Sequence, residues 1–462
     1  MLKLAWLINV FLFFVGLCNA QQHTATAYIT SGNQTQLLKA YKLRLTNQTT
    51  AASKIVIDQT QKFQTVDGFG FTLTGGSALL IQQMHPAAQH ALLEELFGQS
   101  ANAISISYLR ISVGASDLSE SVFSYNDLPN GETDTLLQHF SLSRDTLYLL
   151  PLLQKILRIN PSIKIMATPW SPPVWMKTNG NSIGGRLIPQ YYRAYAQYLV
   201  KYVQAMQSKG IPIDALTIQN EPDHGGNNPS MLMSATEQSL FIKAHLGPLF
   251  TANLIKTKLV IWDHNCDRPD YPIAVLNDAV AKQYIDGSAF HLYAGDITAL
   301  STVKAAHPDK NIYFTEQWTG SKGSFAGDLK WHVKNVLIGS MTNHSKITLE
   351  WNLANDANFG PHTPGGCTEC KGALTIQGNQ VKREVAYYII AHAAKFVPPG
   401  SVRINSNNSG NLYSVAFLTP KGHTILILLN NGDAKSQVSI QWNQQWVNTQ
   451  LNGGDMASIV FK

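Results

Sequence analysis

The chain has 462 residues, of which 44% are hydrophobic and 14% are charged, and its formal net charge is +6. This composition indicates a globular protein with a substantial core and excludes a disordered or coiled-coil chain. Lysine and arginine form no dense block, so we expect no nucleic-acid partner, although the chain holds 9 Trp, 17 Tyr and 18 Phe. The length suits a barrel domain of roughly 250 to over 400 residues together with one accessory unit.

Residues 1–20 have the pattern of an export signal. Lys3 supplies the basic start, residues 7–17 form an apolar run, and small residues end at Ala20, before Gln21. An uncleaved signal anchor is the alternative. Leu17 before Cys18 does not suit lipoprotein processing, so no lipid anchor is predicted. We expect a secreted or periplasmic protein with no stable membrane insertion after the signal is cleaved.

The two ends of the mature chain, residues 21–64 and 396–462, predict a β-sandwich. The N-terminal part holds short β-type runs at 26–30 and 54–57, which are expected to be edge strands in need of partners. The C-terminal part offers those partners, because short alternating runs are separated there by Asn/Gly turns. These C-terminal runs lie at 412–417, 424–429, 437–442 and 457–461.

Between the two ends, residues 65–395 alternate between strand and helix. A helix that Ser143 can cap stops at Asn160, before an apolar strand, and a second helix is ended by Gly210 before the next strand. Such alternation predicts a parallel sheet. Eight candidate strands lie near 69–73, 107–111, 163–167, 215–219, 259–262, 288–292, 312–315 and 347–351. The expected fold is therefore α/β, a (β/α)8 TIM barrel with a flanking all-β sandwich built from both termini.

Two glutamates follow apolar strands at positions where barrel enzymes keep their chemistry. Glu221 comes after the fourth strand and Glu316 ends the seventh. A pair of carboxylates is the minimum equipment for glycoside hydrolysis, in which one acts as acid/base and the other as nucleophile or base. A helix-capping or surface carboxylate is the alternative for Glu221. The sequence does not give their separation, which distinguishes retaining from inverting enzymes.

Polar residues at neighbouring strand ends complete this candidate site. Asn220 could donate a hydrogen bond to the sugar 2-hydroxyl, and His291 and Tyr293 could orient or tune Glu316. Arg110 could keep the nucleophile ionised. A satisfied core histidine and a structural buried ion pair are the alternatives for His291 and Arg110.

Aromatic residues near the same rim could form walls for a sugar ring. Trp170, Trp175 and Trp351 follow the third and eighth strands, although core packing would also explain each of them. The segment 263–267, rich in Asp, His and Asn, lacks a calcium-loop pattern and a matching zinc set. We interpret it as a substrate-contacting loop, and we predict no metal site.

Three cysteines remain after signal cleavage, so at least one thiol stays unpaired. Cys367 and Cys370 could form a zinc half-site, a redox pair or a loop-closing disulfide. Export is predicted and no second pair has zinc-finger spacing, so the disulfide is favoured.

From Asp67 to Lys462 the chain resembles glycoside hydrolase family 30, which includes lysosomal glucosylceramidases, endo-β-1,6-glucanases and some xylan-cleaving enzymes. Both glutamate motifs and a long tryptophan-containing segment occur in the family's order. The resembling segments are 68–70, 109–111, 169–179, 219–222, 290–293, 314–316 and 351–354.

The resemblance implies a retaining β-glycosidase in which Glu221 is the acid/base and Glu316 the nucleophile. It also implies sugar contacts, and it implies no metal or organic cofactor. The implied contacts are at Arg110, Trp170, Asn220, Tyr293 and Trp351.

One departure bears on the substrate. Glucosylceramidases carry an aspartate for the terminal glucose hydroxyls where this chain has Gly75, so we expect weaker recognition of a terminal glucose and room for a further sugar. This segment, the loop at 263–265 and the Cys367 to Cys370 loop resemble the bacterial β-1,6-glucanase branch. The predicted substrate is β-1,6-glucan, as oligosaccharide or polysaccharide. A glucosylated lipid, glucosylceramide, is the alternative, and a non-catalytic carbohydrate-binding protein is the further one.

Overall fold

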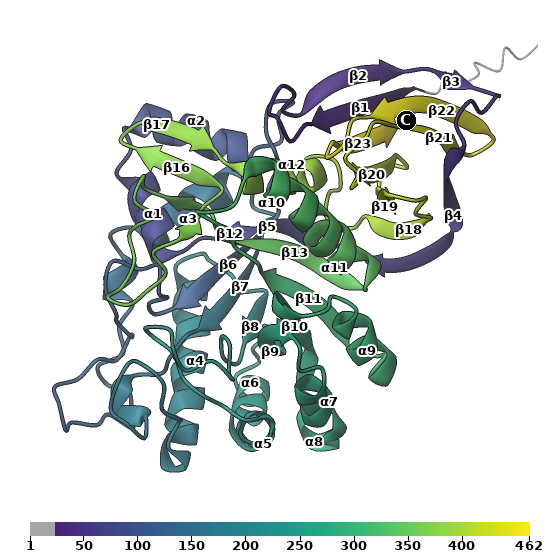
Figure 1. The fold of residues 1–462 in the computed structure, drawn as a ribbon. Helices are drawn as coiled ribbons and strands as arrows, with labels where there is room; N and C mark the ends of the chain where they lie inside the picture. The colour runs from purple at the N-terminus through teal and green to yellow at the C-terminus, as the bar shows by residue number, and fades with distance from the viewer. Residues whose placement is uncertain (1–23) are drawn as a thin grey trace, which may run out of the picture.

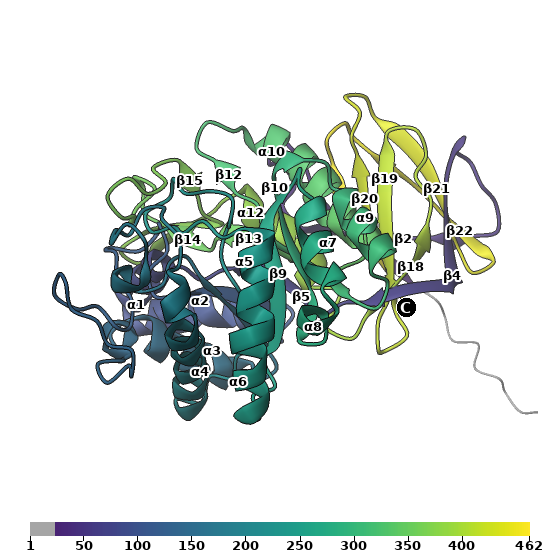
Figure 2. The same cartoon turned by 90° about the horizontal axis from the view of Figure 1, so that it is seen from below.

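The computed structural model describes residues 24–462, so the export signal predicted at 1–20 lies outside the described residues. The described chain forms a barrel and a sandwich that lie side by side (Figure 1, Figure 2). Within residues 24–462, no helix is both long enough and apolar enough to cross a membrane.

The barrel consists of eight parallel strands, as the sequence predicts, and each of them overlaps its predicted position. In order around the ring they are β5 (Gly68–Thr72), β6 (Tyr108–Val113), β7 (Lys164–Pro169), β8 (Ala215–Thr217), β9 (Lys258–Cys266), β10 (Ile285–Gly295), β11 (Asn311–Glu316) and β13 (Ser345–Asn352). Pairing of β13 with β5 closes the ring. The carboxyl ends of all eight strands therefore meet at one rim.

Side chains fill the inside of the barrel. Large Tyr108 and Tyr313 and small Ala215 and Ala289 belong to one buried cluster, so the interior is a packed core rather than a pore. Gly70 lies so close to the backbone of Tyr108 that a Cβ atom would be 1.9 Å from the carbonyl oxygen. This close approach explains why the first strand needs a glycine at that position.

Helices and short sheets surround the barrel. The helices are α1 (Gly75–Gln82), α2 (Pro86–Phe97), α3 (Leu149–Ile159), α4 (Tyr192–Ser208), α5 (Ala235–Phe241), α6 (Gly247–Ala252), α7 (Asp270–Asn277), α8 (Ala279–Lys282), α9 (Ala299–Ala306), α10 (Phe325–Trp331), α11 (Gly339–Thr342) and α12 (Val385–Ala394). The short strands are β12 (Thr319–Gly320), β14 (Ala354–Asn355), β15 (Cys370–Lys371), β16 (Leu374–Gln377) and β17 (Gln380–Arg383).

The start of α3 differs from its prediction. Ser143 begins a single 3₁₀ turn, and the α-helix starts only at Leu149. Pro151 explains the difference, because proline lacks an N–H group and is tolerated only in the first turn of a helix. Both predicted ends are confirmed, since α3 stops before Asn160 and Gly210, at φ +75°, follows the end of α4.

The sandwich contains strands from both termini, as predicted. Its order is β2 (Lys39–Leu43), β1 (Ala25–Thr30), β23 (Met456–Phe461), β20 (Thr424–Asn430), β19 (Leu412–Leu418), β18 (Val402–Ser406), β4 (Ser53–Thr65), β21 (Ser436–Trp442), β22 (Gln445–Leu451) and β3 (Leu45–Thr46). The expectation that β1 and β4 are edge strands is wrong, because β1 lies between β2 and β23 and β4 between β18 and β21. The long β4 pairs through its first part with β21 and through its second part with β18.

Helix α12 joins the two parts through a buried histidine. The Nδ1 atom of His392 lies 2.8 Å from Ser458 Oγ, and its Nε2 atom lies 2.8 Å from Thr30 Oγ1. Ser458 already donates its hydroxyl hydrogen to the His392 carbonyl, so Nδ1 must donate to Ser458 and Nε2 must accept from Thr30. Burial lowers the pKa of His392 to about 3, which keeps this imidazole neutral.

Candidate active site

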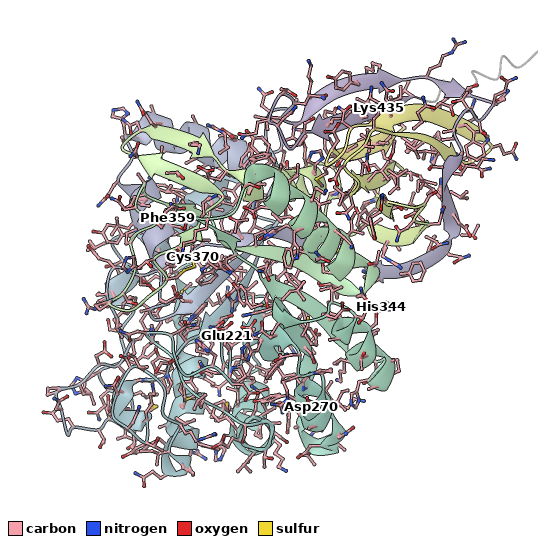
Figure 3. All side chains as sticks on the ribbon, viewed as in Figure 1. Glu221, Asp270, His344, Phe359, Cys370 and Lys435 are labelled. Atoms are coloured by element: carbon pink, nitrogen blue, oxygen red, sulfur yellow. A yellow bond between two sulfur atoms is a disulfide. The ribbon has the colours of Figure 1, made fainter. Side chains whose placement is uncertain are left out.

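A cavity of about 280 Å³ opens at the carboxyl ends of the barrel strands. Its volume is near the lower end of the range for small-ligand sites, about 300 to 1,000 Å³. Figure 3 places Glu221 and Cys370 over the centre of the barrel, far from Lys435 on the sandwich. The lining residues are Asp117, Trp170, Asn220, Glu221, His224, Asn227, His264, Asn265, Tyr293, Glu316, Trp318, Trp351, Cys367 and Cys370.

The fourth strand delivers two of these side chains. Just beyond β8, Glu221 adopts a φ of +45°, which is rare for a residue with a side chain, and its N–H group donates to the Asp263 carbonyl at 3.0 Å. The N–H group of Asn220 donates to the Pro169 carbonyl at 2.8 Å. These backbone bonds to the neighbouring strands hold the turn that points Glu221 into the cavity.

Glu316 ends β11 and faces Glu221 across the cavity. An oxygen of each carboxylate and a ring nitrogen of His291 all lie within 4.8 Å of one another. Glu316 accepts hydrogen bonds from Tyr293 Oη at 2.9 Å and from Arg110 Nη1 at 2.5 Å. Glu221 accepts from Asn227 Nδ2 at 3.2 Å. The two carboxylates therefore share one small space but have different partners.

Arg110 lies behind the carboxylates and is fully buried. Its Nη2 atom donates to Asn220 Oδ1 at 2.7 Å and to Asp263 Oδ2 at 2.9 Å. The guanidinium also lies over the ring of Trp170, 4.8 Å from the ring centroid. Because Arg110 engages the oxygen of the Asn220 side chain, the amide N–H groups of Asn220 remain to serve a ligand.

His291 connects three carboxylates. Its Nδ1 atom is 3.2 Å from Glu221 and 3.7 Å from Glu316, and its Nε2 atom is 3.2 Å from Asp263 Oδ1. Burial by itself lowers the pKa of His291, but the carboxylates of Glu316, Asp263 and Glu221 together raise it to about 9. The imidazole is therefore a cation at neutral pH.

A local irregularity of β9 brings Asp263 to this position. Trp262 and Asp263 both have positive φ values, 70° and 64°, and the pairing of β9 with β10 shifts its register beside them. Asp263 is then fully buried and also accepts from Thr217 and Thr315. This interpretation differs from the prediction for segment 263–267 as a whole. Asp263 does not line the cavity and instead contacts Arg110 and His291 behind it, whereas His264 and Asn265 line the cavity as a substrate-contacting loop would.

The carboxylates and imidazole of Glu221, His291 and Glu316 are of types that can hold a metal ion. Their ligand atoms, however, already have partners in this arrangement. Arg110 and Tyr293 donate hydrogen bonds to the two oxygens of Glu316, and both ring nitrogens of His291 face carboxylates. The chemistry of this donor set is that of a hydrogen-bonded ionic network, and the mechanism proposed below uses no metal.

The structure brings all eight predicted site residues together, in two layers. Six of them line the cavity, whereas Arg110 and His291 are fully buried behind it and contact the carboxylates instead. Their geometry agrees with the predicted tuning of the carboxylates and does not agree with direct sugar contacts. Trp175 is also placed elsewhere, because it packs on Tyr191 and its indole N–H donates to Asn126.

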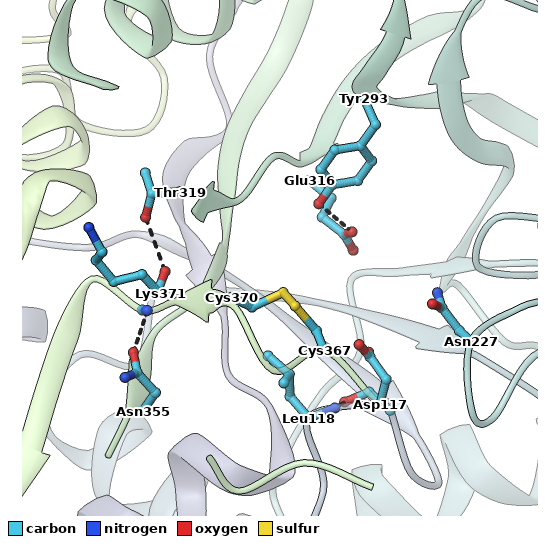
Figure 4. The surroundings of a disulfide bond; sticks show 12 residues. Asp117, Leu118, Asn227, Tyr293, Glu316, Thr319, Asn355, Cys367, Cys370 and Lys371 are labelled. Carbon is cyan, nitrogen blue, oxygen red and sulfur yellow. Dashed lines mark hydrogen bonds between the residues drawn. A yellow bond between two sulfur atoms is a disulfide. The ribbon is translucent and has the colours of Figure 1, made fainter. Parts of the chain in front are cut away.

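Sequence reasoning missed Asp117 and Trp318, which both line the cavity. Each follows a barrel strand within a few residues, and an acid or an aromatic residue at such a position is the signal that could have found them. The disulfide between Cys367 and Cys370 is confirmed, as is an unpaired thiol, the buried Cys266. Figure 4 shows the disulfide beside the cavity, which its spacing in the sequence does not reveal.

The space expected beside Gly75 is absent from the cavity. Gly75 does not line it, and a Cβ atom on Gly75 would meet Ser119 Oγ at 2.9 Å. The loop that carries Asp117 and Ser119 fills the position where the sequence predicted room for a further sugar.

Comparison with known proteins identifies both parts of the chain. Residues 66–397 match the glycosyl hydrolase family 30 TIM-barrel domain, and residues 400–459 match the family 30 beta sandwich domain. The chain is 33% identical over 430 residues to an endo-1,6-beta-D-glucanase of Neurospora crassa, covering 88% of each protein. It is 29% identical over 420 residues to the lysosomal acid glucosylceramidase of Mus musculus, covering 85% of this chain and 80% of that protein.

A solved structure of an endo-beta1,6-glucanase matches with a TM-score of 0.88 at 33% identity, over 95% of this chain and 99% of that one. The fold and the glycoside hydrolase activity predicted from the sequence are confirmed by these matches. The resemblance predicted from Asp67 to Lys462 is confirmed, because the two matched domains cover residues 66–397 and 400–459. The chain belongs to glycoside hydrolase family 30.

Proposed function

We propose that this protein is a secreted enzyme that cleaves β-1,6-linked glucan with retention of the anomeric configuration. The observation that carries the reaction type is the short separation of Glu221 and Glu316, whose nearest oxygens lie within 4.8 Å. Retaining enzymes hold their two carboxyl groups about 5 to 5.5 Å apart, whereas inverting enzymes need about 6.5 to 9.5 Å to admit a water molecule.

The partners of the two carboxylates support the assignment of roles. Glu316 attacks the anomeric carbon and forms the glycosyl-enzyme bond, while the bond from that carbon to the leaving oxygen breaks and Glu221 gives the oxygen a proton. A water molecule then attacks the anomeric carbon, Glu221 takes its proton, and Glu316 is released. Burial raises the pKa of Glu316, and the charges of His291 and Arg110 oppose this rise. Arg110 keeps its charge after His291 has passed its proton to Glu221, so Arg110 favours the ionised nucleophile during the attack.

His291 supplies a place for the proton that Glu221 must deliver. Burial raises the pKa of Glu221, but the hydrogen bond and charge of His291 outweigh it, so the pKa of Glu221 is lowered in the unliganded site. The proton then lies on His291 Nδ1, 3.2 Å from Glu221 Oε1. A short transfer along this contact produces the protonated acid when a sugar fills the cavity.

The relatives support the choice of substrate. The endo-1,6-beta-D-glucanases of Neurospora crassa and Aspergillus fumigatus are 33% and 32% identical to this chain, compared with 29% for the mouse glucosylceramidase. These glucanases are fungal, so they support the β-1,6-glucanase branch without restricting it to bacteria. Glucosylceramide remains the second candidate, because the same kind of cavity would hold its glucose.

The test compares purified mature protein on β-1,6-glucan and on glucosylceramide, with product configuration followed by NMR. We expect preference for the glucan and a β-configured first product. The variant Glu316→Gln should lose at least about 10⁴-fold in kcat, because no covalent intermediate can form. Glu132→Gln, which changes an exposed glutamate, is the matched control and should retain full activity.

Each part of this proposal has its own contradicting outcome. A preference for the lipid would contradict β-1,6-glucan as the substrate. An α-configured first product would contradict the retaining mechanism. Normal turnover by Glu316→Gln would contradict the role of Glu316 as nucleophile. Secretion is tested separately, by sequencing the N-terminus of protein recovered from the medium. We expect it to begin at Gln21.

A further inference from the structure

The positive charge of the protein is concentrated in the sandwich. Its two terminal segments, residues 24–64 and 396–462, contain nine Lys and Arg but only three Asp and Glu, a formal charge of +6. Residues 65–395 contain 25 Lys and Arg and 26 Asp and Glu, a formal charge of −1. An anionic partner is therefore attracted to the sandwich rather than to the barrel.

Most of the sandwich cations are exposed and have no acidic partner. Asp58, the one acid of residues 24–64, accepts hydrogen bonds from Thr60 instead. Exposed cations of the barrel do form ion pairs, for example Lys382 with Glu384 at 2.8 Å. Within residues 24–462, no carboxylate oxygen lies within 4.0 Å of the charged groups of Lys39, Lys42, Arg44, Lys54, Lys62, Lys421 and Lys435. Their charges are therefore not neutralised within the protein.

Strands β4, β21, β22 and β3 give the sandwich an outer face that two of these cations border. Ile55 of β4 and Val447 of β22 pack in the sandwich core. Because side chains alternate along a strand, the neighbouring residues on each strand point outwards. The pairing of the four strands aligns these outward side chains in one row, in the order Val56, Gln441, Trp446 and Thr46. Figure 1 and Figure 2 show these strands on the side of the sandwich far from the barrel.

Trp446 lies in this row with a cation on each side. The Nζ atom of Lys54, from β4, lies 5.8 Å from the centroid of its partly exposed ring. On the other side, Trp446 pairs with Thr46 of β3, and the exposed Arg44 comes two residues before Thr46. The face therefore combines an aromatic surface with positive charge.

This combination fits an acidic polysaccharide better than other polyanions. An indole ring offers an apolar surface to a sugar ring, and Gln441 and Thr46 offer hydrogen bonds to hydroxyl groups. Lys54 and Arg44 suit carboxylate or sulfate groups on the same chain. Single-stranded nucleic acid is bound by stacking successive bases on aromatic rings, and this row holds one ring. A lipid surface requires a broad apolar face, and the row is half polar.

We propose that this outer face of the sandwich binds acidic polysaccharide, through stacking on Trp446 and charge pairing with Lys54 and Arg44. The remaining sandwich cations strengthen the attraction at longer range. Because the face lies far from the barrel, a polymer bound there leaves the cavity open to the substrate. The sandwich then keeps the enzyme on an acidic matrix while the barrel cleaves a different, uncharged glycan.

The test measures binding of the purified mature protein to polygalacturonate, which is carboxylated, and to dextran sulfate, with uncharged dextran as the control ligand. We expect binding to at least one acidic polymer, and this binding should weaken as NaCl rises from about 50 to about 300 mM, because salt screens exposed charges. The tighter of the two polymers identifies the preferred anionic group. No binding to either acidic polymer, or equal binding to uncharged dextran, would overturn the inference.

Substitutions locate the binding on this face. Trp446→Ala should weaken it about tenfold, because the stacking surface is lost. The double variant Arg44→Gln, Lys54→Gln should weaken it by about 2- to 30-fold, the range for two exposed ion pairs. The matched control Lys209→Gln, Lys256→Gln removes the same charge from exposed sites on the barrel and should bind like the wild type. An equal loss in the control would mean that total charge alone attracts the polymer, contrary to the proposal.

Two further ligands separate a polysaccharide from other anionic partners. Single-stranded DNA and vesicles that contain phosphatidylserine should bind more weakly than the preferred acidic polysaccharide, and Trp446→Ala should leave their binding unchanged. Tighter binding of the DNA or of the vesicles would assign the face to nucleic acid or to a lipid surface and would reject the polysaccharide.

This inference and the proposed function fail separately, because one concerns the sandwich and the other the barrel. All the variants should keep the wild-type kcat/KM on a soluble glucan oligosaccharide. Absence of glucan hydrolysis would leave the binding measurements intact. Thermal unfolding identifies a variant that has lost its fold. If Trp446→Ala is such a variant, the double variant of the exposed Arg44 and Lys54 decides the outcome.

Discussion

Two histidines of this protein are fully buried but have different electrostatic surroundings. His291, at the mouth of the barrel, is surrounded by Asp263, Glu221 and Glu316, and its pKa is raised to about 9. His392, between the barrel and the sandwich, contacts two hydroxyl groups, and burial lowers its pKa to about 3. Burial alone therefore does not determine the charge of an interior histidine. The neighbouring groups determine it: carboxylates around His291 favour the cation, which can transfer a proton, whereas hydroxyl groups around His392 leave the imidazole neutral.

Replacing His291 tests the charged side of this comparison, and of the two histidine substitutions it should have the larger effect on catalysis. His291→Gln keeps a donor near Glu221 but holds no proton to share, so we expect kcat/KM to fall on the order of 100-fold, the usual scale for proton-transfer assistance. The loss should depend on the leaving group. The leaving oxygen of a natural glucan needs a proton from Glu221, whereas 2,4-dinitrophenolate leaves without one. A much smaller loss on an aryl glucoside, 2,4-dinitrophenyl β-glucoside, is therefore the signature of this role. Equal losses on both substrates would contradict it.

Stability against pH gives a second measure of the same residue. Because the folded pKa of His291 is raised, its stabilising interactions are fully present below about pH 6.5 and are lost as the pH rises towards 9. Up to about 3 kcal/mol of unfolding free energy should disappear from the wild type over this range. His291→Gln should lack this alkaline decrease in a series of denaturant titrations.

The sequence predicts the residues that line the cavity better than it predicts the residues that hold them in place. Glu221 and Glu316 could be found because each follows an apolar strand, and this local pattern can be recognised in one sequence. Arg110 and His291 share Asp263 as a partner behind the cavity, and the irregularity at Trp262 and Asp263 that positions this aspartate has no local pattern in the sequence. The contact between the Asp117 loop and the Cys367–Cys370 loop is harder still to predict, because Thr363 and Asp117 meet there from a sequence separation of 246.

The disulfide offers an intermediate test, because it belongs to the mouth but carries no charge. Its loop spans a sequence separation of only 3, so chain entropy attributes only about 2 kcal/mol of stability to it. The double variant Cys367→Ser, Cys370→Ser should raise KM for the glucan by about tenfold, because the Cys367–Cys370 loop packs against Asp117 and both line the cavity. Its kcat on the aryl glucoside should change much less than that of Glu316→Gln. An unchanged KM would show that Thr363 and the backbone contacts hold the loop in place without the disulfide.

Replacing His392 tests the neutral side of the comparison and should affect catalysis least. His392→Gln can keep one donor and one acceptor, so at pH 7.5 we expect a loss of about 1 to 3 kcal/mol in unfolding free energy and kcat/KM within about twofold of the wild type. The folded pKa of His392 is depressed, so its contribution is present above about pH 6.5 and is lost as the pH falls towards 3. Through His392 the wild type should lose about 1.4 kcal/mol of unfolding free energy per pH unit in this range. The variant lacks this loss, so the stability difference between the two proteins narrows. Denaturant titrations at pH 7.5 and 5 measure this narrowing. An advantage of the same size at both pH values would mean that the imidazole has the same pKa in the folded and the unfolded protein, and the contrast with His291 would then fail.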